Sequence, residues 1–385
     1  MANASPTGTS PLLRQLHTLA AREPANSPVV SLYLSLVPDQ HGRDNYDVFC
    51  RRTFADQLAG LESRPADQAA LAQVFSRIES YLATDVAPSA NALAVFAAGG
   101  EDDLFETVQL DAPIDSHWLF VGAVPHLYPL ARLIDQYPRY AAVQLDTNHA
   151  RIVVFAAGTV EARAEVTGEK TKRHSMGGWS QARYQRRIDN IRQQHVSEVV
   201  DALERIVRAE QIQHVIVAGD EVVVPMFRKA LPKALAETVV DVMPNDRAAG
   251  EADLAEEALA ALRQKDADSD AERVAEVLGA WRGGGLGVAG AEATLRALQM
   301  GQVDEILITA APDGLTPPQR LPDDAAPAPT AAETTATAGA DTQQLQLADE
   351  LVTRAAQTGA RLRVIEDPAL LAEQGGVAAA LRFRI

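Results

Sequence analysis

Cysteine is almost absent from this sequence, which has a single one, Cys50, among its 385 residues. One cysteine excludes an intramolecular disulfide and a zinc cluster built on cysteine, and it is typical of a reducing compartment. Long apolar runs are missing too, because charged or turn residues interrupt each run before about 18 positions, the length that spans a bilayer. The first ten residues carry no basic patch followed by an apolar stretch, so no secretory signal is expected. These absences favour a cytoplasmic protein without a membrane partner.

Positive charge is also scarce. The chain has 35 Lys and Arg against 52 Asp and Glu, which gives a net charge of −17. A chain this acidic is not expected to bind nucleic acid indiscriminately. Any contact with a polyanion must therefore be local, at a place where basic residues gather. With 47% hydrophobic and 23% charged residues, the composition is otherwise that of an ordinary globular chain.

The length exceeds what one hydrophobic core usually serves, and the sequence divides into three predicted domains. Segment 1–136 mixes helical and strand patterns and is expected to form an α/β domain. Segment 137–279 has three strand patterns in succession, a long amphipathic helix and a βαβ pattern, which predict a mixed sheet. Segment 280–385 alternates helix and strand and predicts an α-β-α sandwich, with a proline-rich insertion at 311–340 that is expected to be disordered. The predicted fold class is therefore mixed α/β (α+β) with three domains.

Alternating apolar residues and apolar spacings of three or four predict the individual elements. Strands are expected at 29–36, 93–97, 105–110, 118–122, 140–145, 152–156, 160–166, 215–218, 305–309, 361–365 and 377–384. Helices are expected at 45–61, 66–82, 224–231, 291–300, 342–358 and 368–374, and a long one runs through Tyr184 to Ile206. The acidic stretch 241–276 is expected to be helical and to face away from any polyanion.

The basic residues gather between Glu169 and Arg192. Seven Lys and Arg stand here against two acidic residues, a net charge of +5. Gly177 and Gly178 allow positive φ and a close backbone approach, and the following serine is a suitable N-cap for the helix. Free backbone N–H groups and cationic side chains then converge on one place, which predicts an anion site. Nucleic acid is the natural polyanion, and Trp179 can stack on an unpaired base, a contact worth about 1 to 3 kcal/mol.

Simpler interpretations stay open for these features. A Gly-Gly pair before a helix is commonly an ordinary turn, and neighbouring arginines on an exposed helix face are commonly only solvated. The glycine run 283–287 lacks the P-loop lysine and is expected to be a linker. Ser175 and Ser180 have no recognisable partners for a nucleophile. No metal site or cofactor is predicted, because no second ligand stands at metal spacing from His149, His174 or His195.

The segment HSMGGWSQARYQRR, on a loop between a three-strand meander and a long helix, resembles the central domain of the archaeo-eukaryotic class 1 release factors and Pelota. The form is that of their bacterial Balon-like and Vms1-like relatives. The closing segment GGVAAALRFRI, Gly375 to Ile385, is similar to the last strand of the release-factor and Pelota C-terminal domain. The resemblance covers roughly Tyr137 to Ile385. It implies a factor that binds the bacterial ribosome in the A site.

The resemblance also implies partners and contact residues. The partners are rRNA and tRNA, and a translational GTPase such as elongation factor Tu is a candidate for delivering the protein. The residues expected to contact rRNA or tRNA are Lys170, Lys172, Arg173, His174, Gly177, Gly178, Trp179, Arg183, Arg186 and Arg187.

Three functions are compatible with the sequence. In release factors the loop carries Gly-Gly-Gln, and the glutamine positions water for attack on the peptidyl-tRNA ester. Here Trp179 stands in its place, and an indole cannot replace a carboxamide. The first hypothesis is therefore a non-hydrolytic factor resembling Balon or Pelota, which occupies vacant or stalled ribosomes during hibernation or rescue. The second is a Vms1-like peptidyl-tRNA hydrolase with Gln181 as the catalytic residue. The third is an RNA- or protein-binding adaptor that acts through the C-terminal sandwich, from about Arg282 onward.

Overall fold

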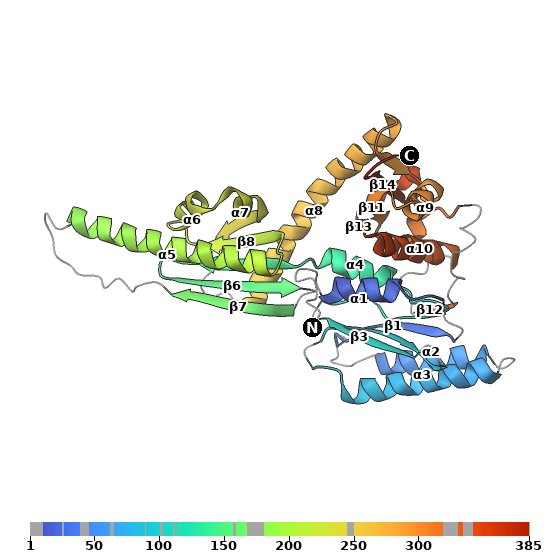
Figure 1. The fold of residues 1–385 in the computed structure, drawn as a ribbon. Helices are drawn as coiled ribbons and strands as arrows, with labels where there is room; N and C mark the ends of the chain where they lie inside the picture. Colours follow the sequence, from blue (N-terminus) through green and yellow to red (C-terminus); the bar gives the residue numbers. More distant parts are fainter. Residues whose placement is uncertain are drawn as a thin grey trace, which may run out of the picture. The chain divides into compact units, whose positions relative to one another are not determined.

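The chain folds into three sheets and their covering helices (Figure 1), which confirms the predicted mixed α/β class. By their contacts the residues form two compact units: one contains Tyr137–Asp266, and the other joins Pro11–Gln136 to Ala267–Ile385. In the described part of the chain no helix is long and apolar enough to cross a membrane. The computed structural model describes residues 11–24, 27–38, 46–61, 65–88, 90–100, 103–110, 112–114, 116–156, 159–167, 181–244, 250–318, 330–333 and 342–384.

The first unit is built on a mixed sheet with the strand order β7-β6-β5-β8-β9. The first three strands along the chain pair antiparallel as the predicted meander, whereas β8 and β9 run parallel to β5 and β8 respectively. This confirms the mixed central sheet expected from the sequence. The strands are β5 (Tyr140–Leu145), β6 (His149–Ala156), β7 (Thr159–Thr167), β8 (His214–Gly219) and β9 (Val239–Pro244), and the helices are α5 (Gln181–Ala209), α6 (Val224–Ala230), α7 (Lys233–Thr238) and the first part of α8 (Glu251–Arg282).

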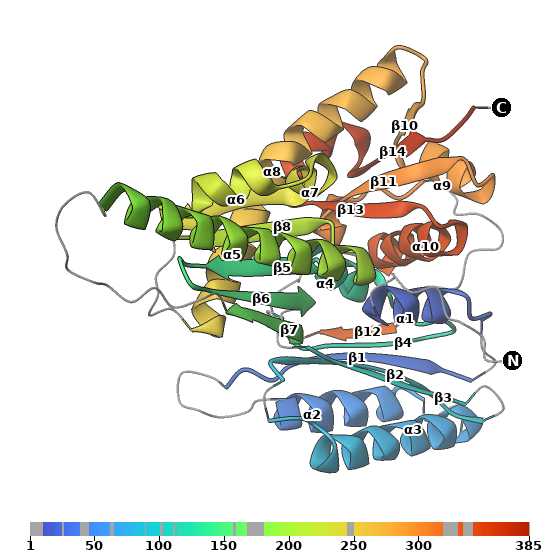
Figure 2. The ribbon, with the colours of Figure 1, turned by 60° about the vertical axis from the view of Figure 1, so that its left-hand side comes forward.

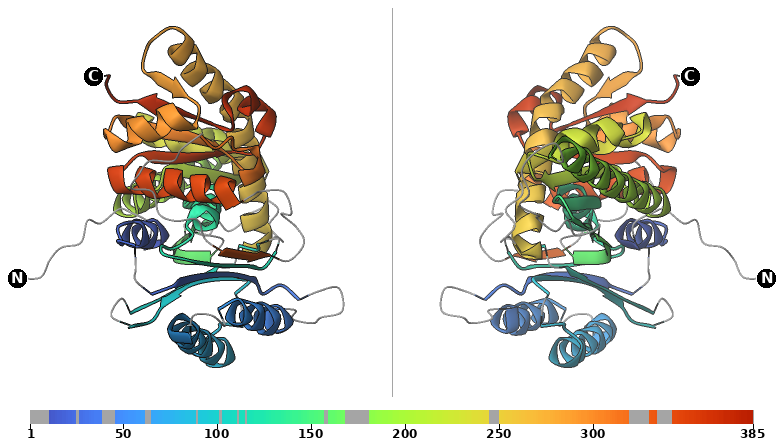
Figure 3. Two further views of the ribbon diagram at one scale, coloured as in Figure 1. Left: turned by 90° about the vertical axis from the view of Figure 1, so that its right-hand side faces the viewer. Right: turned by 90° about the vertical axis from the view of Figure 1, so that its left-hand side faces the viewer.

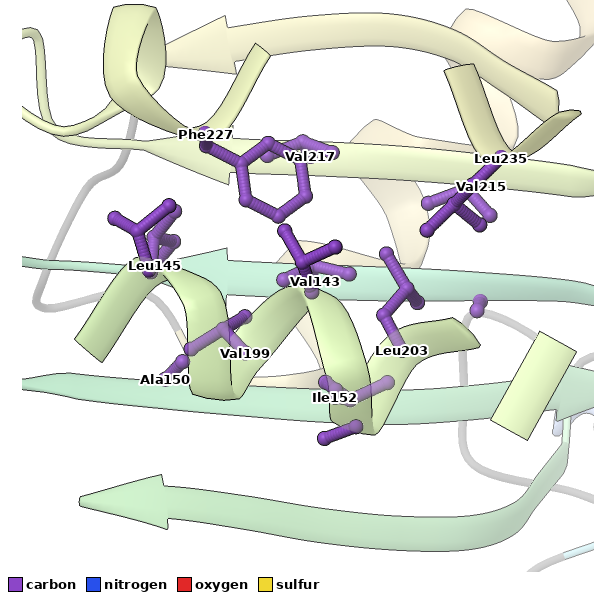
Figure 4. Packing of buried hydrophobic residues seen from close by; sticks show 14 of the residues in the cluster. Val143, Leu145, Ala150, Ile152, Val199, Leu203, Val215, Val217, Phe227 and Leu235 are labelled. Carbon is purple, nitrogen blue, oxygen red and sulfur yellow. The ribbon is translucent and has the colours of Figure 1, made fainter. Parts of the chain in front are cut away.

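Strand alternation gives this sheet two apolar faces. Val143 and its alternate neighbours on β5 pack against α5, α6 and α7, where Val199 and Leu203 of α5 are fully buried (Figure 4). The intervening residues of β5 face the other way and pack against Leu254, Ala258 and other apolar residues of α8. Because both faces of the sheet are covered from within Tyr137–Asp266, this unit has its own core.

The second unit contains an antiparallel sheet of order β12-β4-β1-β2-β3. Helices α2 and α3 cover one face of it (Figure 3), with Phe54 and Phe75 stacked at 4.0 Å between ring centroids. The strands are β1 (Val29–Ser35), β2 (Ala92–Ala98), β3 (Leu104–Leu110), β4 (Trp118–Gly122) and β12 (Thr330–Glu333), and the helices are α1 (Pro11–Ala20), α2 (Tyr46–Ala59), α3 (Pro65–Thr84) and α4 (Tyr128–Gln136).

The same unit contains a second sheet of order β10-β14-β11-β13, in which β11 and β13 are parallel (Figure 2). Val277 and Leu278 of α8 pack on one face, and α9 and α10 contact the strands from the other. This confirms the predicted α-β-α sandwich. The elements are β10 (Gly287–Ala289), α9 (Ala291–Gln299), β11 (Val303–Thr309), α10 (Thr342–Thr358), β13 (Arg361–Ile365) and β14 (Val377–Leu381), with single 3-10 turns at Pro312–Gly314, Pro368–Leu370 and Ala372–Gln374.

A buried carboxylate ties α10 to the start of α4. Asp349 accepts hydrogen bonds from the backbone N–H groups of Leu127 (2.9 Å) and Tyr128 (3.1 Å) and pairs with the ring of His126. The Tyr128 hydroxyl in turn donates to the carbonyl oxygen of Thr309 at 2.6 Å. Asp349 therefore caps a helix that lies more than two hundred residues earlier in the chain.

The structure differs from the sequence expectations at three short strands. β9 lies at the start of the stretch that was expected to be helical, and β10 begins at the end of the expected glycine linker. β12 lies inside the insertion that was expected to be disordered, of which residues 311–318 and 330–333 are described. Residues 330–333 have no apolar alternation, but they pair antiparallel with β4 and form the edge of the sheet. Backbone hydrogen bonding rather than a side-chain pattern therefore defines this strand, so it could not be predicted from the sequence.

Gly287 shows why the glycine run is more than a linker. A Cβ atom at this position would lie 2.5 Å from the carbonyl oxygen of Val277 and 2.7 Å from the amide nitrogen of Trp281. Only glycine allows the strand to approach α8 this closely. The prediction of a plain linker is wrong for this residue, because its glycine is required by packing.

Candidate functional site

The candidate site lies where β7 leads to α5. Lys170, Lys172, Arg173, His174, Gly177, Gly178 and Trp179 fall between these elements and lie outside the described residues. Gln181 and Arg183 belong to the first turn of α5, where only the helix itself is described. Arg186 and Arg187 follow on the next turn, and both side chains are exposed. The structure thus places three of the predicted contact residues and the predicted catalytic residue Gln181 on one helix end.

The described side chains in the N-terminal half of α5 are open to solvent. No residue from Arg186 to Gln194 is buried, and His195 is the first buried residue among the described side chains of this helix. Beyond His195 the helix packs on the sheet through Val196, Val199 and their neighbours. Figure 1 accordingly shows the first turns of α5 extending past the ends of β6 and β7. The helix is therefore anchored by its second half, and its first half is available for contacts.

The charge of α5 changes along its length. Residues 181–194 contain four arginines and one aspartate, a net charge of +3, whereas residues 195–209 have a net charge of −1. The first turn contains no acidic residue. Cations at this end oppose the helix dipole, so they do not stabilise the helix. The positive end of the helix dipole and the arginine side chains instead both attract an anion to this end of the helix.

The two exposed arginines lack intramolecular partners. In the described part of the chain, neither Arg186 nor Arg187 forms an ion pair, whereas Arg192 lies 3.8 Å from Asp189. Their charges are therefore free to meet a phosphate group. Exposed polar residues that the sequence analysis did not single out share this face, because Asn190 lies four positions after Arg186 and a glutamine lies seven after it. Helical spacing from Arg186 is the signal that would have found them.

His195 stands at the boundary between the free and the packed half of α5. Its side chain is only 1% exposed, and neither ring nitrogen has a hydrogen-bond partner. Burying both ring nitrogens among apolar side chains without a hydrogen bond is energetically unfavourable. In the described residues, no group of three His, Cys, Asp or Glu side chains could hold a metal ion.

Arg139 fixes the opposite end of α5. Its guanidinium donates to Glu161 of β7 at 2.7 Å and to the carboxylate of Glu210, directly after the helix, at 2.7 Å. Burial alone would lower the pKa of Arg139, but the hydrogen bonds to Glu210 and Glu161 outweigh it and raise the pKa above its ordinary value. The arginine therefore stays charged and holds the helix end against the edge strand that leads to the site.

Comparison with known proteins agrees with this arrangement. Residues 125–263 match the model of a bacterial release-factor family, so this part of the chain is release-factor-like, as the sequence resemblance predicted. The matching model is that of the bacterial archaeo-eukaryotic release factor family 10. The matched residues include the whole mixed sheet, α5 and the segment that leads into it.

Three solved structures illustrate the likeness. An archaeal translation termination factor, aRF1, is 20% identical, with 97% of this chain and 96% of that chain covered and a TM-score of 0.25. A ribosome-bound archaeal Pelota, described together with ABCE1, is 16% identical, with 97% and 94% covered and a TM-score of 0.41. Dom34 of S. cerevisiae is 9% identical, with 76% and 80% covered and a TM-score of 0.40.

Proposed function

We propose that this protein is a ribosome-associated translation factor of the cytoplasm that occupies the A site of vacant or stalled ribosomes, in hibernation or rescue, without hydrolysing peptidyl-tRNA. The observation that carries the proposal is the stretch of α5 from Arg186 to Gln194, which has no buried residue and lies inside the release-factor match. Its Arg186 and Arg187 form no ion pair with the residues that the structure describes. The proposed ligands are phosphates of rRNA and tRNA. A translational GTPase such as elongation factor Tu is the proposed partner for delivery.

The proposal assigns phosphate contacts to the cations on both sides of the Gly177–Gly178 pair and base stacking to Trp179. Lys170, Lys172, Arg173 and His174 precede it, and the α5 arginines follow it, so cations flank the loop on both sides. Trp179 supplies a flat ring for stacking on a base rather than a carboxamide for orienting water. Binding without hydrolysis is the expected outcome of this residue set.

Cosedimentation with bacterial ribosomes tests the proposal. The full chain is expected to pellet with vacant ribosomes and to release no peptide from ribosomes loaded with peptidyl-tRNA. The double variant Arg186→Ala, Arg187→Ala should weaken binding at least about tenfold. The slope of log K against the logarithm of the salt concentration should become less steep by about one to two, because one to two phosphate contacts are lost. The matched control is Arg205→Ala with Arg208→Ala, which removes the same charge from exposed positions on the anchored half of the same helix and should bind as the native chain does.

Three outcomes would contradict the proposal. Equal loss in both double variants would mean that net charge, not position, governs binding. Peptide release that disappears in Gln181→Ala, with ribosome binding retained, would make the protein a hydrolase. Binding by a fragment that begins at Arg282, as tight as that of the full chain, would favour the adaptor.

A further inference from the structure

A cavity of about 230 Å³ lies in the second unit, whereas the basic helix end belongs to the first. Four aromatic or heteroaromatic side chains line it, Trp118, Phe120, His126 and Tyr128, and the first turn of α10 contributes Leu345. The volume lies just below the roughly 300 to 1,000 Å³ of sites for drug-sized ligands. It therefore suits a molecule with one or two rings.

The position of the cavity in the fold is one at which ligands commonly bind. Residues 310–312 directly follow β11, and Glu366 directly follows β13, the two parallel strands of the sandwich. In α/β sheets, ligands bind in the crevice outside the carboxyl ends of parallel strands. The cavity lies at these strand ends.

Two buried hydrogen-bond donors at the cavity lack acceptors. Neither the indole Nε1 of Trp118 nor the Nε of Arg132 has a hydrogen-bond partner, and both atoms are buried. Buried donors of this kind are rare in proteins and call for an explanation. The Tyr128 hydroxyl, which stays protonated because burial raises its pKa, donates to the carbonyl of Thr309 and accepts from neither of the two unpaired donors. An acceptor on a ligand would meet the unpaired donors after a small side-chain adjustment.

The charges around the cavity are balanced. Nη2 of Arg132 lies 3.4 Å from the carboxylate of Glu366, which also accepts a 2.6 Å hydrogen bond from Gln136. His126 is paired with Asp349. A cationic ligand would be repelled by Arg132 and an anionic ligand by Glu366, so a neutral ligand fits best. Glu366 is half exposed at the rim and retains capacity to accept a further hydrogen bond.

We propose that this cavity binds a neutral, planar heteroaromatic ring that carries both hydrogen-bond acceptors and donors, the chemical class of the nucleobases. The aromatic walls contact the ring, its acceptors face Trp118 and Arg132, and a donor faces Glu366. Free nucleosides and an unstacked base of RNA present the same ring. The site is separate from α5, so it does not depend on the proposed ribosome contact.

Titration of the full chain tests this site. Adenosine, guanosine, cytidine and uridine are titrated one at a time by isothermal calorimetry, and single-stranded oligoribonucleotides form a second arm. At least one nucleoside or oligoribonucleotide is expected to bind saturably with Kd below about 1 mM. Trp118→Phe keeps an aromatic ring but removes the N–H donor and should weaken binding about tenfold. Trp281→Phe is the matched control, because Trp281 is 42% exposed and does not line the cavity.

A second variant separates loss of the donor from loss of the fold. Ala311→Leu fills the cavity and should abolish binding while the circular dichroism spectrum stays native. If only the nucleosides bind, and Trp118→Phe weakens that binding, the ligand of the cavity is a small metabolite. If only the oligoribonucleotides bind, and Trp118→Phe weakens that binding, the ligand is a base of RNA. The proposal fails if no ring binds, if Trp118→Phe binds as tightly as the native chain, or if benzoate binds better than all four nucleosides.

Discussion

His195 is the residue at which α5 changes from a free to a packed helix. Its imidazole is buried beside Val196 and Val199 with both nitrogens lacking partners. A buried polar group that makes no hydrogen bond costs about 1 to 3 kcal/mol. The apolar stripe of α5 would continue without interruption if position 195 carried leucine, since Ile191 and Val199 lie four residues to either side.

His195→Leu is therefore expected to stabilise the packed half of α5 by about 1 kcal/mol. Amide hydrogen exchange along the helix measures this, because it reports local opening free energies even where a chain with two units does not unfold in one step. Protection should rise from position 195 onward and stay unchanged from 186 to 190. His195→Asn, which keeps a polar group of smaller volume, is the comparison and should lower protection. Reduced protection in His195→Leu would mean that the ring nitrogens are satisfied in solution.

Single residues of the candidate site could be predicted only in part. The excess of cations before and along the helix is visible in the sequence, and Arg186 and Arg187 are exposed and form no ion pair with other described residues. Arg139 was missed, because its partners Glu161 and Glu210 lie on other elements and nothing near it in the sequence signals the contact. The donors at the cavity were missed for the same reason. Local patterns report what a residue is, whereas its role depends on neighbours brought together by the fold.

At the scale of elements, α4 is held by a residue that follows it by more than two hundred positions. Asp349 of α10 accepts from the N–H groups of Leu127 and Tyr128 and pairs with His126. Free N–H groups at a helix start need acceptors, and here they are provided by another element. This also explains why the sequence did not predict α4, since it has no local cap and is only nine residues long.

Asp349→Ala should destabilise the second unit by about 3 to 5 kcal/mol, because it leaves two N–H groups and a buried histidine without their partner. Thermal unfolding of the full chain is expected to show the transition of this unit shifted to lower temperature. Asp313→Ala is the matched control: Asp313 is exposed, and its loss should change the free energy of unfolding by less than about 0.5 kcal/mol. Equal shifts in the two variants would contradict the capping role.

The elements predicted correctly are those whose pattern is local. The meander β5 to β7, the long helix α5 and the alternation in the sandwich follow from apolar periods of two or of three to four residues. β10 and β12 were missed because they are short and take their stability from pairing with β14 and β4. A strand of three or four residues carries too few side chains for a period to be recognised.

For the whole molecule, the main feature is that Pro11–Gln136 and Ala267–Ile385, which are far apart in the sequence, share one compact unit. Besides the capping aspartate, the side chain of Gln357 donates to the carbonyl of Ala20 at 2.8 Å, and the N–H of Val364 donates to Asp135 at 3.1 Å. The sandwich also takes part of its core from α8, through Val277 and Leu278. None of these contacts can be predicted from a pattern along the chain. The hydrogen bonds join residues that are far apart in the sequence, and the α8 contacts cross a domain boundary that was predicted from the sequence.

These contacts predict how fragments of the chain behave. A fragment of residues 282–385 loses the α8 side chains on one face of its sheet and the partners of Asp349 on the other. It is expected to be loosely packed, to bind a hydrophobic dye and to unfold without a sharp transition. A fragment of residues 137–266 keeps both apolar faces of its sheet covered and should unfold cooperatively. Dye binding and calorimetry on the two fragments test this.

The fragments also bear on the choice of function. A sandwich that takes part of its core from α8 and the partners of Asp349 from Leu127 and Tyr128 is not expected to act as a separate adaptor, whereas a cooperative unit at 137–266 can carry the α5 arginines on its own. The isolated 137–266 fragment is then expected to retain weak, salt-sensitive binding to ribosomes that is lost with Arg186→Ala and Arg187→Ala. A sharp transition in the 282–385 fragment would mean that the sandwich is independent after all, and the adaptor hypothesis would regain its physical basis.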